Sequence, residues 1–149
     1  MACTFDTNIL VYTLPHPDNP KHGRARDLLI RAARPDAGVL LLQSLAEFSH
    51  VAARKFGMDI DSILRRVRGW RDAIPTHAAG EEDLLAALEL ARGHRLSFWD
   101  ALLCATADNA GFRYLLSEDM QNGRRIGDLT IVNPFEPANA ALIDHLLPP

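Results

Sequence analysis

The 149-residue sequence has few lysines, few cysteines and no long hydrophobic run. Lys21 and Lys55 are its only lysines against fourteen arginines, so any mechanism that needs a lysine has two candidates. Cys3 and Cys104 form no Cys-x-x-Cys pair and lie among apolar residues, which predicts reduced, buried side chains. No apolar run approaches the ~20 residues of a membrane span, and the start of the sequence lacks the basic region of a signal peptide. We therefore expect a cytoplasmic protein with no membrane partner.

The sequence also lacks the glycine-rich motifs that bind phosphates and the Gly-x-Ser-x-Gly elbow of acyl-transfer enzymes. Its net charge of −3 argues against a nucleic-acid module held by charge alone, although a metal ion could supply the missing positive charge. The six histidines include no i, i+4 pair, so they and the cysteines offer no zinc site. The composition, 48% hydrophobic and 23% charged, is ordinary for a globular protein, and the length fits one domain over residues 1–149.

Short apolar runs alternate with helical patterns along the chain. We expect strands at residues 3–6, 39–42, 113–116 and 129–132 with a short edge strand at 74–78, and helices at residues 20–33, 44–57, 59–73, 81–92, 97–110 and 138–147. The segment 121–128 is expected to be a flexible loop. This alternation predicts an α/β fold, a three-layer α/β/α sandwich with a mainly parallel central sheet of four to five strands.

Four acidic residues occupy positions that a parallel sheet would bring to one edge. Asp6 and Asp119 each follow a predicted strand, and the carboxyl ends of parallel strands face the ligand crevice. Glu47 and Asp100 fall in the first turns of predicted helices that begin at the same edge. We therefore expect the four carboxylates to converge on one rim.

Each acid also has a purely structural explanation. Ser44-x-x-Glu47 has the spacing of a helix capping box and Ser97-x-x-Asp100 resembles one, while the other two acids could close turns. However, four carboxylates at one rim repel one another unless a cation lies among them. A cluster of oxygen ligands suits Mg²⁺ or Mn²⁺. Acidic metal sites without a phosphate-binding loop typically hydrolyse phosphodiesters.

Four segments, in this order, resemble the PIN domain and most closely the VapC-type ribonuclease toxins of bacterial toxin–antitoxin pairs. They are Cys-Thr-Phe-Asp-Thr-Asn at 3–8, Ser-Leu-Ala-Glu-Phe at 44–48, Ser-Phe-Trp-Asp-Ala-Leu at 97–102 and Leu-Ser-Glu-Asp-Met at 116–120. Residues 130–135 also resemble the last strand of these toxins. The likeness extends from residue 3 to about residue 135.

The resemblance implies a PIN-like fold and an endoribonuclease that depends on Mg²⁺ or Mn²⁺, is silenced by a cognate antitoxin protein and is usually a homodimer. It assigns catalysis and metal binding to the four acids, and it gives Asn8 and Ser117 supporting positions beside them. Members of the family cut transfer, ribosomal or messenger RNA, and the motifs do not choose among these substrates. Arg124 and Arg125, in the predicted loop after Asp119, are the candidates for RNA phosphate contacts.

Three other interpretations fit parts of the sequence. A haloacid-dehalogenase-like phosphatase needs a second Asp two residues after the first, where Asn8 stands, and it needs a positioned lysine. A response-regulator receiver needs a lysine after its last strand, and no lysine follows Lys55. A non-enzymatic PIN-like module that binds metal or RNA remains the alternative to a nuclease.

Overall fold

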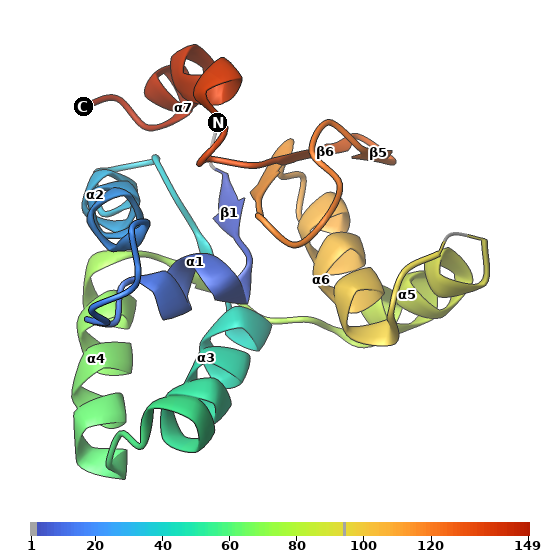
Figure 1. Cartoon of the computed structure of the whole chain (residues 1–149). Helices are drawn as coiled ribbons and strands as arrows, with labels where there is room; N and C mark the ends of the chain where they lie inside the picture. Colours follow the sequence, from blue (N-terminus) through green and yellow to red (C-terminus); the bar gives the residue numbers. More distant parts are fainter. Residues whose placement is uncertain (1–2, 94) are drawn as a thin grey trace.

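The computed structural model describes residues 3–93 and 95–149 (Figure 1). The strands are β1 (Thr4–Phe5), β2 (Leu40–Leu41), β3 (Thr76–His77), β4 (Tyr114–Leu116), β5 (Arg125–Ile126) and β6 (Leu129–Val132). The helices are α1 (Thr7–Tyr12), α2 (His22–Ala32), α3 (Leu42–Phe56), α4 (Ile60–Ala73), α5 (Glu81–Gly93), α6 (Phe98–Asn109) and α7 (Ala140–Leu146), with a 3₁₀ turn at Pro137–Asn139. No helix in these described ranges is both long and apolar enough to cross a membrane.

The main sheet has the strand order β1-β4-β6-β5. β1 pairs with β4 and β4 with β6 in parallel, whereas β5 runs antiparallel to β6. β2 and β3 form a second, parallel pair, and one isolated bridge between Cys3 and Gly38 connects it to the β1 side. The predicted fold class, with its mainly parallel central sheet, is therefore confirmed.

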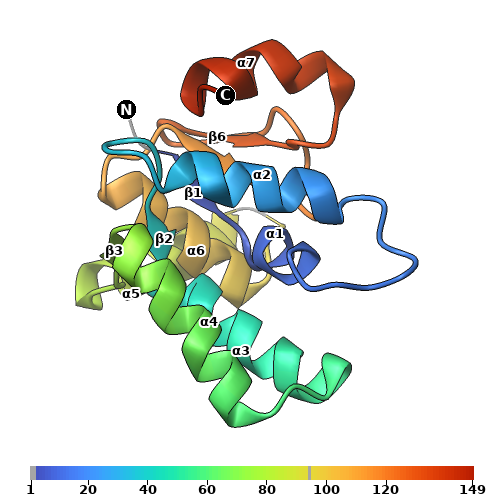
Figure 2. The ribbon, with the colours of Figure 1, turned by 90° about the vertical axis from the view of Figure 1, so that its left-hand side faces the viewer.

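Helices cover both faces of the main sheet. Leu116 and Val132 pack into a core with α1, α2, α3 and α4, whereas the adjacent residues Leu115 and Ile131 pack into a second core against α6. Figure 1 shows α1 and α2 on one side of the strands and α6, backed by α5, on the other, and Figure 2 shows α2 lying across β1. Continuous apolar runs in the strands suit this arrangement because each strand buries both of its faces.

Most predicted helices are present, and residues typical of helix caps mark their ends. The Asp59 side chain accepts the backbone N–H of Ser62 at 2.8 Å and begins α4, and Gly57 ends α3 in the left-handed conformation at φ 62°. Ser97 caps α6 by accepting the N–H of Asp100 at 3.2 Å. The two cysteines are free and buried, as predicted.

Helix α1 was not predicted. Its six residues, Thr-Asn-Ile-Leu-Val-Tyr, are rich in β-branched and polar side chains, which are weak helix formers. The helix forms because Asp6 accepts the N–H of Thr7 at its start and because Ile9 and Leu10 are fully buried beneath the sheet edge.

The predicted start of α3 was wrong, and so was the capping box. The helix begins at Leu42, two residues before Ser44, and its N-cap Leu41 makes no side-chain cap. The Ser44 hydroxyl instead donates to the Phe5 carbonyl at 2.8 Å, which ties α3 to the end of β1. Glu47 consequently lies in the second turn of the helix and has no capping role.

The predicted loop at 121–128 contains a strand. Residues Arg125 and Ile126 pair with Thr130 and Leu129 of β6, and Ile126 is buried. Gly127, at φ 59°, makes the tight connection between the strands, as glycine does at the first central position of such hairpins. Arg125 therefore lies on a strand, not in a flexible loop.

Candidate active site

The four predicted acids line one cleft of about 400 Å³. Asp6 follows β1, Glu47 comes from α3, Asp100 from the first turn of α6, and Asp119 from the segment after β4. Because β1 and β4 are parallel neighbours, their carboxyl ends lie together and bring the first and last of these acids to the same edge. The predicted convergence of the four carboxylates is confirmed.

Asp6 is the most buried acid of the cleft, with 7% of its surface exposed. One carboxylate oxygen accepts the Thr7 N–H at 2.7 Å and the other accepts the Ser117 hydroxyl at 2.6 Å. These bonds favour the charged form, but burial, reinforced by the charges of Asp100 and Asp119, outweighs them and raises the pKa of Asp6 to about 6. Ser117 thus holds the acid in place without neutralising its charge.

Glu47 is held by two side chains. Its Oε1 accepts the Gln43 amide at 2.7 Å and its Oε2 accepts the Thr7 hydroxyl at 3.2 Å. The same Gln43 amide also donates to the Trp99 carbonyl at 2.8 Å, which connects α3 to the start of α6. The carboxylate is therefore oriented by neutral donors, and no ion pair within the described residues involves it.

Asp100 lies beside these groups. Burial raises its pKa, and the nearby charges of Glu47 and Asp119 add to the rise, although a hydrogen bond to the Ser97 side chain opposes it. The acids are thus close enough to repel one another. This mutual repulsion is expected of a cluster that binds a cation.

Asn8 also lines the cleft. Both polar atoms of its side-chain amide are buried, and neither has a hydrogen-bond partner among the described residues. Leaving a buried amide unsatisfied costs about 1–3 kcal/mol, so the group is suited to a ligand that enters the cleft.

The donor set fits a hard divalent cation because every acidic donor is a carboxylate oxygen. Within the described ranges, however, no three carboxylate, imidazole or thiol side chains are close enough together to enclose an ion. The acids form an open rim. Ligand shells that keep several waters suit Mg²⁺, which is commonly bound through one or two carboxylates.

Lys55 was not predicted to belong to the site, although it too lines the cleft. It lies in the last turn of α3. A lysine near a helix C-terminus is already explained by its favourable interaction with the helix dipole, so the sequence offers no reason to place it in the site. Gln43 was also missed. Its role depends on its position one turn before Glu47, and the helix start predicted at Ser44 excluded it from the helix.

Arg124 and Arg125 are not among the described residues that line the cleft. Arg125 is exposed on β5, and the Arg124 carbonyl accepts the N–H of Ile131 from β6. Their predicted contact with RNA stays a prediction.

A model of the PIN domain matches residues 3–126 of the chain. The chain belongs to the PIN domain family. Membership of this family excludes the haloacid-dehalogenase-like phosphatase and the response-regulator receiver as the fold of this chain. No curated protein sequence matches this PIN domain significantly.

Several solved structures share the fold of this PIN domain. The sarcin–ricin loop cleaving toxin VapC20 of Mycobacterium tuberculosis is 18% identical, with a TM-score of 0.61 over 76% of this chain and 87% of that one. A toxin–antitoxin complex from Klebsiella pneumoniae contains a chain that is 21% identical, with a TM-score of 0.65 over 91% and 99% of the two chains. VapBC2 from Rickettsia felis, solved on a DNA fragment from its promoter, is 18% identical, with a TM-score of 0.64 over 88% and 97%. At these identities the likeness shows the fold.

The raised pKa of Asp6 predicts how pH affects stability without metal. The pKa is about 6 in the folded protein against an ordinary value of 3.8, so folding favours the protonated acid. The free energy of unfolding should therefore fall as the pH rises from about 4 through 6. Asp6→Asn removes this loss, and its stability relative to the parent should increase by about 2–3 kcal/mol between pH 4 and 7. Urea denaturation in EDTA measures the difference, and a constant difference across this range would show that folding does not raise the pKa of Asp6.

Proposed function

We propose that this PIN domain is an endoribonuclease toxin of a type II toxin–antitoxin pair and that it depends on Mg²⁺ or Mn²⁺. The observation that carries the proposal is the cleft in which Asp6, Glu47, Asp100 and Asp119 meet at the carboxyl edge of a PIN sheet. The toxin and the toxin–antitoxin complexes among the structures with this fold support it.

Each acid has a role in the proposed reaction. Asp6, Asp100 and Asp119 would hold the ion, and Glu47, which lines the same cleft, would act as the base. When bound, a divalent ion would supply positive charge against the phosphate and would lower the pKa of water. Glu47, oriented by Gln43, accepts the proton of the attacking water. No histidine is among the described residues that line the cleft, so no imidazole there could act as the base for the RNA 2′-hydroxyl.

Cleavage of single-stranded RNA tests this function. The purified chain should cut RNA in Mn²⁺ or Mg²⁺ and should lose the activity in EDTA. The Asp100→Asn variant should be inactive in the same buffer. RNA that is bound in both buffers and cut in neither would favour the non-enzymatic PIN-like module.

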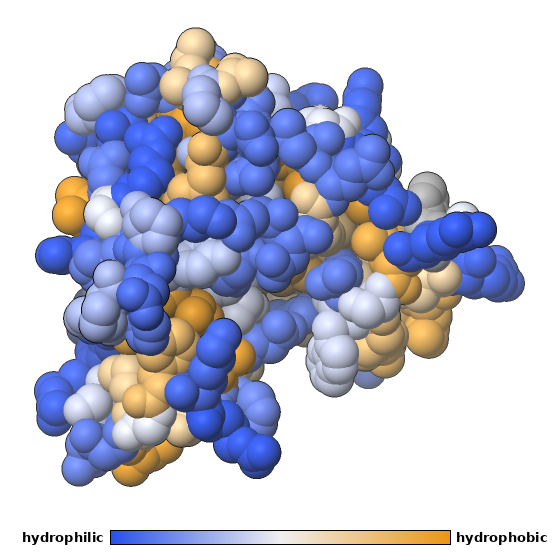
Figure 3. Space-filling model, viewed as in Figure 1, coloured by the Kyte–Doolittle hydropathy of each residue, from blue (hydrophilic) through white to orange (hydrophobic). Residues whose placement is uncertain are grey.

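A cognate antitoxin is the proposed protein partner. An apolar cavity of about 600 Å³ lies beside the acid cleft and includes Leu42, Trp99 and Leu102, and Glu47 lines both spaces. Trp99 is 60% exposed and Leu42 is 53% exposed, so two large apolar side chains of this cavity face solvent, as at protein-interaction sites. In Figure 3 further apolar residues gather at the right of the view, over α5. An antitoxin segment with apolar anchors could cover this cavity while an arginine enters the acid cleft.

We therefore predict that the antitoxin inserts at least one arginine and competes with metal. The purified complex should bind Mn²⁺ at least tenfold more weakly than the free chain in calorimetric titration. Trp99→Ala should weaken the complex and leave the Mn²⁺ affinity of the free chain unchanged. A complex that binds Mn²⁺ as tightly as the free chain would mean that inhibition does not occur at the acids.

We also propose how the chain assembles and where it contacts its substrate. The chain is proposed to act as a cytoplasmic homodimer of a single-domain subunit, with Arg124 and Arg125 contacting RNA phosphates outside the cleft. Transfer, ribosomal and messenger RNA all carry the required phosphodiester.

A further inference from the structure

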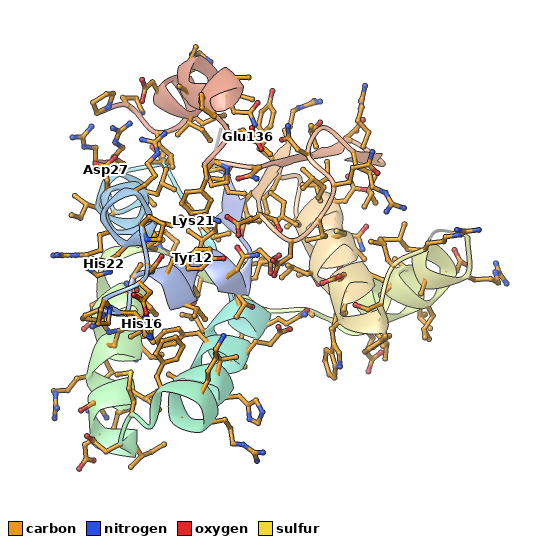
Figure 4. All side chains as sticks on the ribbon, in the orientation of Figure 1. Tyr12, His16, Lys21, His22, Asp27 and Glu136 are labelled. Carbon is orange, nitrogen blue, oxygen red and sulfur yellow. The ribbon has the colours of Figure 1, made fainter. Side chains whose placement is uncertain are left out.

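A second cavity, of about 390 Å³, adjoins the acid cleft. It lies between the α1–α2 connection and the C-terminal end of α3, and Val11, Tyr12 and Lys55 line both spaces. Its volume falls in the range of roughly 300–1,000 Å³ that is usual for ligand sites. Figure 4 shows the side chains of Tyr12, His16 and Lys21, which line it, gathered near α1 and α2.

The two lysines of the chain both line this cavity, but they differ in their partners. Lys21 forms an ion pair with Glu118, which also accepts the Tyr12 hydroxyl at 2.7 Å, so the charge of Lys21 is compensated. For Lys55, no carboxylate of the described residues lies within ion-pair distance. Lys55 therefore places a positive charge that no described ion pair holds at the boundary between the cavity and the cleft.

Phe56 supplies an aromatic surface next to this charge. Its ring is half-buried, lies 6.0 Å from the Lys55 ammonium and meets the His16 ring edge-to-face at 6.2 Å between centroids. Aromatic faces beside cations are how proteins bind unpaired bases and their phosphates, since a base stacks on the ring and the cation contacts the backbone.

The loop that closes the cavity is preorganised. The Asn19 side chain donates to the Tyr12 carbonyl at 3.1 Å and accepts the Lys21 N–H at 3.0 Å. His16 accepts the Asp18 N–H at 3.3 Å through its Nδ1. A wall held in this way loses little conformational freedom when a ligand binds.

We propose that this cavity binds one unpaired base of the RNA, next to the phosphodiester that lies in the acid cleft. Phe56 stacks on the base, and Lys55 contacts the phosphate between the two spaces. The inference rests on the proposed nuclease function and adds the subsite that positions its substrate. The positive charge of Lys55 repels an arginine of the antitoxin from this cavity, whereas the carboxylates of the neighbouring cleft attract such an arginine.

Binding of a fluorescein-labelled single-stranded RNA, measured by anisotropy in EDTA, tests the subsite without cleavage. Phe56→Leu keeps an apolar side chain but removes the ring, and it should weaken binding roughly tenfold. Phe56→Tyr keeps the ring and should bind within about twofold of the parent. The fluorescence of an RNA that carries 2-aminopurine should change on binding the parent and Phe56→Tyr, and change much less with Phe56→Leu, because stacking on the ring alters the emission of the base.

Lys55→Gln should weaken binding and should lower the slope of log affinity against log salt by about 0.7, the value for one phosphate contact on a single strand. Arg54→Gln is the matched control, since it removes the same charge from an exposed neighbour that lines neither space. The control should change the affinity and the slope much less.

The outcomes separate the subsite from the nuclease. A parent protein that cuts RNA, with Phe56→Leu and Lys55→Gln binding it as tightly as the parent, would overturn the subsite and leave the function intact. A parent that shows the predicted stacking but cuts no RNA would overturn the nuclease and leave the subsite. If the two substitutions weaken only the complex with a purified antitoxin, the cavity is a protein-docking site and the inference is wrong.

Discussion

Glu47→Gln should reduce the rate of RNA cleavage by two or more orders of magnitude. The substitution keeps the size of the side chain and an oxygen that can accept from Gln43 or Thr7, but it removes the group that accepts the proton of the attacking water. Positioned general bases contribute about 10²–10⁴-fold to rates. RNA affinity in EDTA should fall little, because the proposed base and phosphate contacts lie outside this carboxylate. Single-turnover cleavage with saturating Mn²⁺ measures the effect on the chemical step.

The position of Glu47 within α3 excludes one structural explanation of a slow variant. Glu47 lies in the second turn of α3 and has no capping role, so a slow variant cannot be explained by loss of a helix cap. Glu89→Gln, the same change at an exposed position of α5, is the matched control and should cleave at the parental rate. Near-parental turnover of Glu47→Gln would remove Glu47 from the reaction.

Asp100→Asn should weaken Mn²⁺ binding by tenfold or more, and Asp6→Asn should do the same. Both acids carry raised pKa values in the metal-free protein because they are buried beside other carboxylates, and a cation relieves this repulsion. Calorimetric titration with Mn²⁺ measures the loss. Asp61→Asn, on the exposed face of α4, should bind Mn²⁺ as the parent does.

Metal-free stability separates metal binding from capping at Asp100. Ser97 begins α6 by accepting the backbone N–H of residue 100, a bond that the asparagine variant retains. Asp100→Asn should therefore be at least as stable as the parent in EDTA, because the relief of repulsion offsets the loss of the charged acid at the start of α6. A clear loss of stability would favour a structural role, and unchanged Mn²⁺ affinity in both variants would contradict the metal site.

The sequence alone was enough to predict the parts of the fold that depend on local patterns. The strand at Leu129–Val132 and the helices α4 and α6 have runs or caps that act within a few residues. Helix α1 could not be predicted because its stability comes from burial of Ile9 and Leu10 against distant segments. The two residues of β5 are too few to show a strand pattern, although the Ile-Gly-Asp-Leu sequence at 126–129 is a hairpin signal that could have indicated it.

The candidate site also has parts that the sequence predicts and parts that it does not. The convergence of the four acids was predictable because Asp6 and Asp119 follow parallel strands whose carboxyl ends meet at one edge, and the helices that carry Glu47 and Asp100 were expected to begin at that edge. The orientation of Glu47 by Gln43 and the placement of Lys55 depend on the true start of α3 and on the register of its turns. The cavity at Phe56 joins a loop to the far end of that helix, and no spacing in the sequence links residues 16 and 56.

The ends of the RNA products test the central claim most directly. Attack by water on phosphorus, with Glu47 as base and with the 3′-oxygen as the leaving group, would leave a 5′-phosphate and a 3′-hydroxyl. Cleavage with Mn²⁺, followed by ligation that requires a 5′-phosphate and by mass spectrometry of the fragments, identifies both ends. The account predicts these ends, with no cleavage in EDTA or by Asp100→Asn. Metal-independent products that end in a 2′,3′-cyclic phosphate would contradict it.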